Sequence, residues 1–219
     1  MGRLKLHTDV RRGQIARAVL AIAAEGGLAD LSVAAVARRV GLAPSALYRH
    51  FPSKEAMLET MLERLGAQLL ENVERARAEA RDPLDALERL LKLHVSIVRE
   101  SRALPLSLLS EGFFHSPRRR ARLLHVIGRY RRAIAGLVLE AQALGLVRRD
   151  VAADTLAIMF IGLLQPAAFL WHLSAGRFGL TSHTRRAWAV FHTSIHTPRA
   201  PARRVRPRAR RASVQEKTA

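Results

Sequence analysis

Residues 31–58 constrain the fold more than any other stretch, because two short helical patterns flank a tight turn there. Ser32 is a suitable N-cap for the first helix. Gly41 supplies the turn, since a residue without Cβ adopts positive φ readily. Pro44 fits the first turn of the second helix, over about residues 44–50, where its missing N–H is not needed. The stretch therefore predicts a helix-turn-helix. The apolar stripe of its first helix is Val33, Val36, Ala37 and Val40.

The second of these helices has the features of a DNA-recognition helix. It is too short to be stable alone, so neighbouring helices must hold it. Leu47 and Phe51 are expected to face those neighbours, which leaves the opposite face free to enter the major groove of DNA.

The rest of the chain is predicted to be helical, because apolar residues recur at helical spacing and no sustained period-two alternation indicates a strand. We expect an all-α fold of about nine helices. Those outside the helix-turn-helix are expected over about residues 11–25, 54–80, 83–101, 104–114, 117–144, 151–175 and 181–196. The inward residues expected on the helix after Ser116-Pro117 are Leu123, Val126, Ile127, Tyr130, Ile134, Leu137, Val138 and Ala141. Asp150 is expected to cap the helix that follows.

Four parts of the chain follow from this pattern. A loose basic arm is expected at residues 1–10, and a DNA-binding domain at 11–55, or about 9–69 with its linking helix. A larger helical domain is expected at 56–197. The tail at 198–219 is rich in Pro, Arg and Ala and is predicted to be disordered. Its excess of arginine suits either non-specific DNA affinity or a solubilising role.

The charge balance favours a polyanionic partner. The chain has 37 Lys and Arg against 18 Asp and Glu, a formal net charge of +19. Cysteine is absent, which excludes disulfides and thiol nucleophiles. The polar N-terminal residues do not form a signal peptide, so we expect a cytoplasmic protein.

The motif of residues 31–58 resembles the tetracycline-repressor (TetR) family of bacterial transcriptional regulators. The resemblance rests on Leu31-Ser32-Val33, Val36-Ala37, Gly41-Leu42 and the run from Leu47 to Glu55. It implies a homodimer that reads a palindromic operator in double-stranded DNA. It also implies a C-terminal domain that carries the dimer interface and a pocket for a small-molecule effector.

The resemblance also assigns roles to individual residues. Ser32, Tyr48, His50 and Lys54 match positions near phosphate, and Pro44, Ser45 and Ala46 match the start of the recognition helix, which faces base edges. Ala43 departs from the family pattern, because a capping serine is frequent there. Ser45 and Ala46 offer few hydrogen-bonding groups, so Arg49 and Arg38 are expected to make more of the contacts with bases.

Each assignment has a simpler alternative. Tyr48 and His50 suit half-buried packing, and Arg38, Arg39 and Arg49 suit a solvated face.

The predicted ligand pocket is built from polar and aromatic residues of the larger domain. These are His94, Phe113, Phe114, Tyr130, Gln165, Phe169 and Trp171. An ordinary helical core would contain the same types of residue, so a packed core is the alternative. An apolar or amphipathic effector is expected, with no cofactor.

Residues 156–173 carry no formal charge over about the length of a membrane span. Gln165, Pro166 and His172 interrupt that stretch, so we favour a buried helix and expect no membrane partner. With the last helix, which contains Trp188, Val190, Phe191 and Ile195, it is expected to form a four-helix bundle with a second subunit. His192 and His196 share a helix face, yet a metal site wants three or four ligands, so no metal is expected.

Two other functions fit the same chain less well. A DNA-binding architectural or cell-cycle factor on this scaffold needs no small-molecule ligand. An enzyme is not expected, because we find no nucleophile–base pair, no Gly-rich phosphate loop and no metal-ligand cluster.

Overall fold

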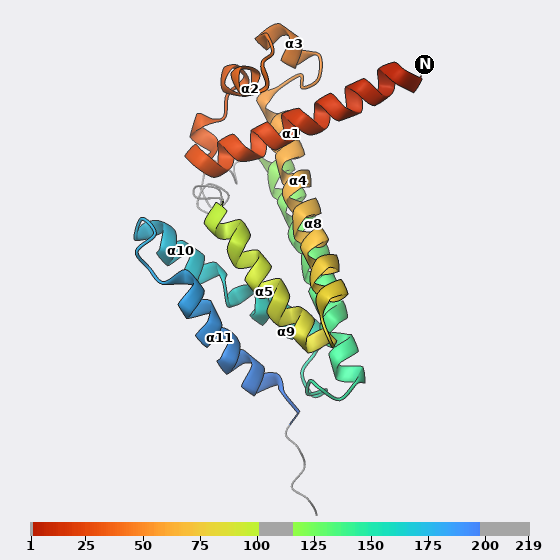
Figure 1. Ribbon diagram of the computed structural model, residues 1–219, viewed down its shortest axis with the longest axis vertical. Coiled ribbons are helices and arrows are strands. Elements are labelled where there is room, and N and C mark those ends of the chain that lie inside the picture. The colour runs from red at the N-terminus through yellow and green to blue at the C-terminus, as the bar shows by residue number, and fades with distance from the viewer. Residues whose placement is uncertain (1, 101–115, 198–219) are drawn as a thin grey trace, which may run out of the picture.

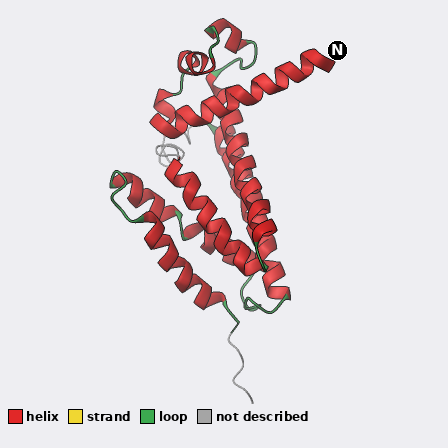
Figure 2. Ribbon diagram, viewed as in Figure 1, coloured by secondary structure: helices red, strands yellow, loops and turns green. Residues whose placement is uncertain are grey.

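The structure is a computed structural model that describes residues 2–100 and 116–197. Within these residues it contains nine α-helices and no strand, as predicted (Figures 1 and 2). The helix expected at residues 104–114 and the basic tail at 198–219 lie outside the described residues. The helices are α1 (Gly2–Asp30), α2 (Val33–Val40), α3 (Pro44–Tyr48), α4 (Lys54–Glu79), α5 (Pro83–Glu100), α8 (Pro117–Ala143), α9 (Ala153–Gly162), α10 (Gln165–Leu173) and α11 (Leu180–Ile195).

Helix α1 is longer than predicted at both ends. It begins at Gly2, so the expectation of a loose arm at residues 1–10 is wrong. No proline interrupts the chain between Gly2 and Asp30, and the helix continues through the basic residues. Gly27 has φ 82° and ψ −175°, and it kinks α1 at the glycine pair where the sequence predicted an end.

Helix α4 belongs to both parts of the protein. Ser53 caps it, since its Oγ accepts a hydrogen bond from the N–H of Ala56 at 3.1 Å. Its first turns pack against α1, α8 runs alongside it, and α5 packs on it further along (Figure 1). The predicted core residues of this helix are all buried: Met57, Leu58, Met61, Leu62, Leu65, Leu69 and Val73.

The body behind α4 is built on α5 and α8, and both start as predicted. Asp82 Oδ1 accepts hydrogen bonds from the N–H groups of Leu84 and Asp85 at 2.9 and 2.8 Å. Ser116 Oγ accepts one from Arg119 at 3.3 Å. The inward face of α8 is as expected except at Ile127, which is 43% exposed. Ile127 lies at the edge of the buried apolar face of α8, and this face is narrower than the spacing of apolar residues predicted.

The predicted helix over 151–175 is divided in two. Helices α9 and α10 meet at Leu163–Leu164, just before Pro166, which lacks a backbone donor and crowds the preceding turn. Residues 153–173 are long and apolar enough to cross a membrane, yet α9 packs on α8 and α10 packs on α11. The predicted cap is also wrong. Ala152 is the N-cap of α9, and Asp150 is bound by Arg148 at 2.5 Å instead.

Helix α11 is buried mainly against its own chain. Trp188, Phe191 and Ile195 are at most 8% exposed, and Trp188 packs edge-on against Phe160. These three side chains therefore contribute to the core of their own chain. Val190 differs, because it is 73% exposed.

Candidate nucleic-acid interface

The turn between α2 and α3 has the geometry that the sequence predicted. Ser32 Oγ accepts a hydrogen bond from the N–H of Ala35 at 3.1 Å and caps α2. Gly41 is left-handed at φ 66° and ψ 37°. The N–H of Leu42 then donates to the carbonyl of Ala37 at 2.9 Å, which closes the end of α2. These contacts fix the direction in which α3 leaves the turn.

Helix α3 is held from one side only. Leu47 is fully buried and Phe51 is 4% exposed, so both anchor the helix to the N-terminal core. Ala43 is its N-cap and makes no side-chain hydrogen bond, as the sequence predicted. With five residues and no cap, α3 depends on this anchoring for its stability.

The predicted DNA-contacting residues all have side chains that reach the surface. Tyr48 is 53% exposed, so about half of its surface is open to a partner. Ala46, in the middle of α3, and His50, in the turn that follows α3, are half-buried. The remaining members of the set are exposed: Ser32, Arg38, Pro44, Ser45, Arg49 and Lys54.

Two cations beside α3 are tied to α1. Lys54 Nζ donates to the carbonyl of Leu28 at 3.3 Å. Arg39 forms a two-pronged ion pair with Glu25, with its shorter N···O distance at 2.5 Å. The hydrogen bond from Arg39 lowers the pKa of Glu25, and desolvation opposes this shift. Sequence reasoning missed Glu25, because its partner lies fourteen residues away and no local spacing links them.

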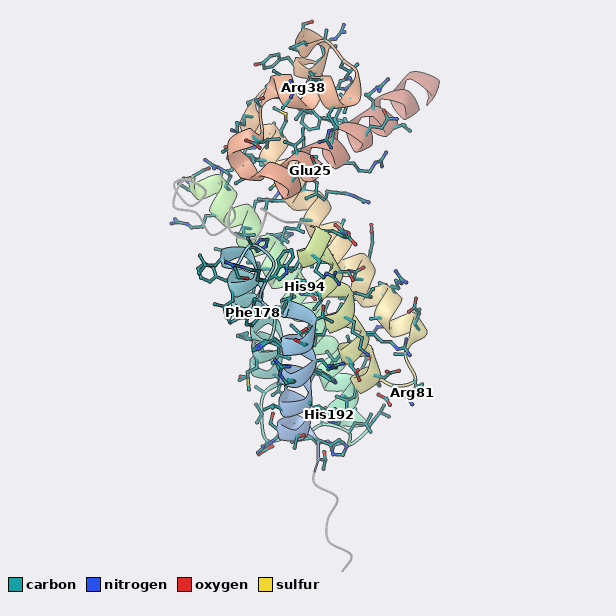
Figure 3. The ribbon with its side chains drawn as sticks, turned by 60° about the vertical axis from the view of Figure 1, so that its left-hand side comes forward. Glu25, Arg38, Arg81, His94, Phe178 and His192 are labelled. Carbon is teal, nitrogen blue, oxygen red and sulfur yellow. The ribbon has the colours of Figure 1, made fainter. Side chains whose placement is uncertain are left out.

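Arg38 borders a crevice between α1 and α2. The crevice has a volume of about 490 Å³, and Figure 3 shows Arg38 on α2 above Glu25 on α1. Its polar lining mixes both signs of charge, in Glu25, Asp30, Arg38 and Arg39. Arg38 has no ion pair among the described residues, so its guanidinium is free for another partner.

The residues predicted for a ligand pocket do not all come together. His94 and Tyr130 do, deep between α5 and α8, where the Tyr130 hydroxyl lies 3.2 Å from His94 Nδ1. Burial lowers the pKa of His94 to about 4 and raises that of Tyr130. Gln165 and Phe169 are exposed on α10, and Trp171 is half-buried there. Phe113 and Phe114 lie outside the described residues.

The histidine pair of α11 gains no further ligand. The rings of His192 and His196 are 5.5 Å apart, and no third metal-binding side chain joins them within the described part of the chain.

Comparison with known proteins gives a match at the N-terminal unit. Residues 15–61 match the family model described as bacterial regulatory proteins, tetR family. The matched segment runs from the core of α1 to the second turn of α4, so it contains the whole helix-turn-helix.

The similarity to three known proteins extends beyond that segment. The nucleoid occlusion factor SlmA of Aliivibrio fischeri is 25% identical over 187 residues, which is 84% of this chain and 95% of that protein. A putative transcriptional regulator from Saccharomonospora viridis, solved in complex with choline, has a TM-score of 0.74 at 20% identity and covers 86% of this chain and 98% of its own. The regulator FadR of Bacillus subtilis, solved in complex with stearoyl-CoA, has a TM-score of 0.71 at 19% identity, with 84% and 98% covered. The two structures share the fold of this chain over most of its length.

Proposed function

The chain belongs to the TetR family of bacterial transcriptional regulators, and we propose that it is a homodimeric repressor released from a palindromic operator by a small apolar or amphipathic molecule. The observation that carries this proposal is the form of α3, a five-residue helix anchored by Leu47 and Phe51 with its other face free. Residues 11–55 then form the DNA-binding domain, and 56–197 the regulatory and dimerisation domain. Regulators of this kind are generally not enzymes, and they act in the cytoplasm, where the chromosome lies.

In the proposed complex, α3 lies in the major groove and the two copies of α3 in the dimer are about 34–36 Å apart. The first turn of α3 faces base edges through Pro44, Ser45 and Ala46. Because these side chains carry few hydrogen-bonding groups, Arg49 and Arg38 supply most of the direct base contacts, and DNA shape contributes to specificity. The proposed phosphate contacts are Ser32, Tyr48, His50 and Lys54.

Exposed apolar residues support a second subunit on the α9–α11 side of the body. Large apolar side chains that a soluble monomer would rarely expose together lie on these three helices. They are Ile158, Met159, Phe169, Leu170, Leu173 and Val190, each at least 44% exposed. A two-fold dimer through this surface matches a palindromic operator.

Ion pairs give a route by which the body acts on the DNA-binding domain. Three glutamates on the first turns of α4 pair with three arginines at the start of α8: Glu55 with Arg119, Glu59 with Arg118 and Glu63 with Arg122. Since α4 carries Lys54 at its start, a movement of α8 that breaks these pairs turns α4 and shifts the spacing of the two recognition helices. A ligand drives that shift only to the extent that it binds the two states differently.

The buried His94–Tyr130 pair supplies polar groups for an effector in an otherwise apolar body. The related structures solved with stearoyl-CoA and with choline support a small-molecule role for this body, although they differ in the ligand they hold.

A thermal-shift screen of the full chain tests the repressor proposal. A ligand present at about 100 times its Kd stabilises the folded form by about 2.7 kcal/mol, which raises Tm by roughly 5–10 °C for a domain of this size. The same ligand should release the protein from a duplex recovered by selection from random DNA. A compound that raises Tm and leaves DNA binding unchanged contradicts an effector role for it.

A second candidate is a DNA-binding nucleoid or cell-cycle factor that needs no ligand. The observation that favours it is the likeness to nucleoid occlusion factors over most of the chain. Mapping of bound sites in the genome separates the two candidates, because a repressor is expected at few promoters and a nucleoid factor at many dispersed sites.

Glu25 is expected to restrain DNA binding through Arg39. In the variant Glu25→Gln, a negative charge disappears beside the interface and Arg39 loses its ion pair. Non-specific DNA affinity should therefore rise by about threefold to tenfold at low salt, with a steeper salt dependence. Fluorescence anisotropy over a salt series measures both effects. Glu71→Gln, which breaks an exposed ion pair with Arg64 on α4, is the matched control and should change neither.

A further inference from the structure

Helices α5 and α11 lie side by side in the body (Figure 1). A groove of about 260 Å³ is lined by side chains of both helices. Leu91 and Val95 of α5 and Trp188 of α11 form its apolar floor. Each of the three is at most 8% exposed, so only a small part of each side chain faces the groove. The groove lies on a different face of α5 from His94, which packs on Tyr130 of α8.

The charges on the rim of this groove do not cancel. Glu88 and Lys92 form an ion pair at 2.6 Å and neutralise each other. Arg99 and Arg185 also line the groove, both are exposed, and neither has a carboxylate within ion-pair range in the described parts of the chain. Two uncompensated guanidinium groups therefore border an apolar floor.

The hydroxyl groups of the groove are largely engaged within their own helices. Thr184 Oγ1 donates to the carbonyl of Leu180 at 2.9 Å, and Ser96 Oγ donates to that of Lys92 at 3.4 Å. A neutral polar ligand would gain little from them. The parts of the groove that remain available to a ligand are the two guanidinium groups and the apolar floor.

The two kinds of surface lie toward opposite ends. Helices α5 and α11 run antiparallel (Figure 1). Arg99, near the end of α5, and Arg185, near the start of α11, therefore lie toward one end of the groove, and Leu91, two turns before Arg99, lies toward the other. From residue 88 to residue 99, α5 advances about 16 Å at 1.5 Å per residue. This length suits an extended alkyl chain with a charged head.

We propose that the α5–α11 groove binds a free amphipathic anion, a straight-chain carboxylate of medium length. Its hydrocarbon covers Leu91, Val95 and Trp188, and its carboxylate is held by the guanidinium groups of Arg99 and Arg185. Guanidinium and carboxylate form short, charge-assisted hydrogen bonds, often in pairs. The site stands whether or not the chain is a repressor, because it uses no residue assigned to DNA contact or to the predicted ligand pocket.

Trp188 is a reporter within the site. The chain has two tryptophans, so the variant Trp171→Phe leaves Trp188 as the sole emitter. Decanoate, kept below its micelle concentration, should shift the Trp188 emission in a saturable way. Octanoate should bind on the order of tenfold more weakly, since each buried methylene contributes about fourfold. Decanol and decyltrimethylammonium test the need for negative charge and should bind far more weakly.

Variants on this background locate the carboxylate. Arg99→Gln with Arg185→Gln should weaken decanoate binding by about tenfold or more. Arg186→Gln is the matched control, because Arg186 is exposed on the same helix and does not line the groove. Ser96→Phe should fill the groove and abolish the emission shift.

Several results would overturn the proposed decanoate site. Unchanged decanoate affinity in the double arginine variant or in Ser96→Phe overturns the proposal, as does equal binding of decanol. A response to anionic vesicles without one to monomeric decanoate also overturns it and points to a lipid surface instead. Single Arg185→Gln, at an exposed position, repeats the test if the double variant is unstable.

Discussion

Replacing Tyr48 and Lys54 together with alanine is expected to weaken binding to a selected operator duplex by about a hundredfold or more at about 0.15 M salt. Each side chain is assigned one hydrogen bond to phosphate, and a hydrogen bond to a charged group contributes about 1.5–3 kcal/mol. The loss should be similar for all sequences, because phosphate contacts position a protein without reading bases.

The fold should survive this double change. Tyr48 is 53% exposed, and the bond of Lys54 to the Leu28 carbonyl, at 3.3 Å, is the one side-chain hydrogen bond found for these two residues in the described chain. Tm and the oligomeric state are therefore expected to stay at wild-type values, which scanning calorimetry and size-exclusion chromatography check. Arg132→Ala, an exposed cation on α8, controls for loss of charge and should leave operator affinity nearly unchanged. Wild-type affinity in the double variant would contradict the assignment of α3 as the recognition helix.

Acidification is expected to destabilise the protein by up to about 3 kcal/mol through His94 alone. Burial lowers the pKa of His94 to about 4 in the folded state, from an ordinary value of 6.5. The unfolded chain therefore takes up the proton first as the pH falls. The contribution of neutral His94 is fully present above about pH 6.5 and is lost progressively as the pH falls toward about 4.

The buried pair explains why protonation is costly. Neutral His94 offers an unprotonated Nδ1 to the Tyr130 hydroxyl at 3.2 Å, and burial raises the pKa of Tyr130, which keeps its proton. A protonated imidazole has no acceptor nitrogen and would place an unpaired charge in the core.

Urea unfolding at about pH 7 and about pH 4.5, at one fixed protein concentration, measures this effect. In His94→Gln, the fall in unfolding free energy over that interval should be smaller by about 2–3 kcal/mol. His125→Gln changes an exposed histidine of α8 and should retain the wild-type pH dependence. Equal slopes for wild type and His94→Gln would show that His94 is not the titrating group.

Local sequence signals determined the structure of the helix-turn-helix. A cap at Ser32, a turn at Gly41, a proline at the start of α3 and two anchors at Leu47 and Phe51 all lie within twenty residues of one another. Such features act through contacts between near neighbours, so spacing alone predicts them. The same holds for the buried faces of α4, α5 and most of α8, where helical periodicity sets the inward side.

Only the tertiary structure decided which side chains from distant segments meet. The Glu25–Arg39 and Glu59–Arg118 ion pairs, the burial of Trp188 within its own chain and the α5–α11 groove have no local signature, because each joins side chains of different helices. The predicted pocket shows the same limit. Periodicity placed His94 and Tyr130 inward, but their 3.2 Å contact depends on how α5 crosses α8, and periodicity fixes the face of a helix without fixing its partner.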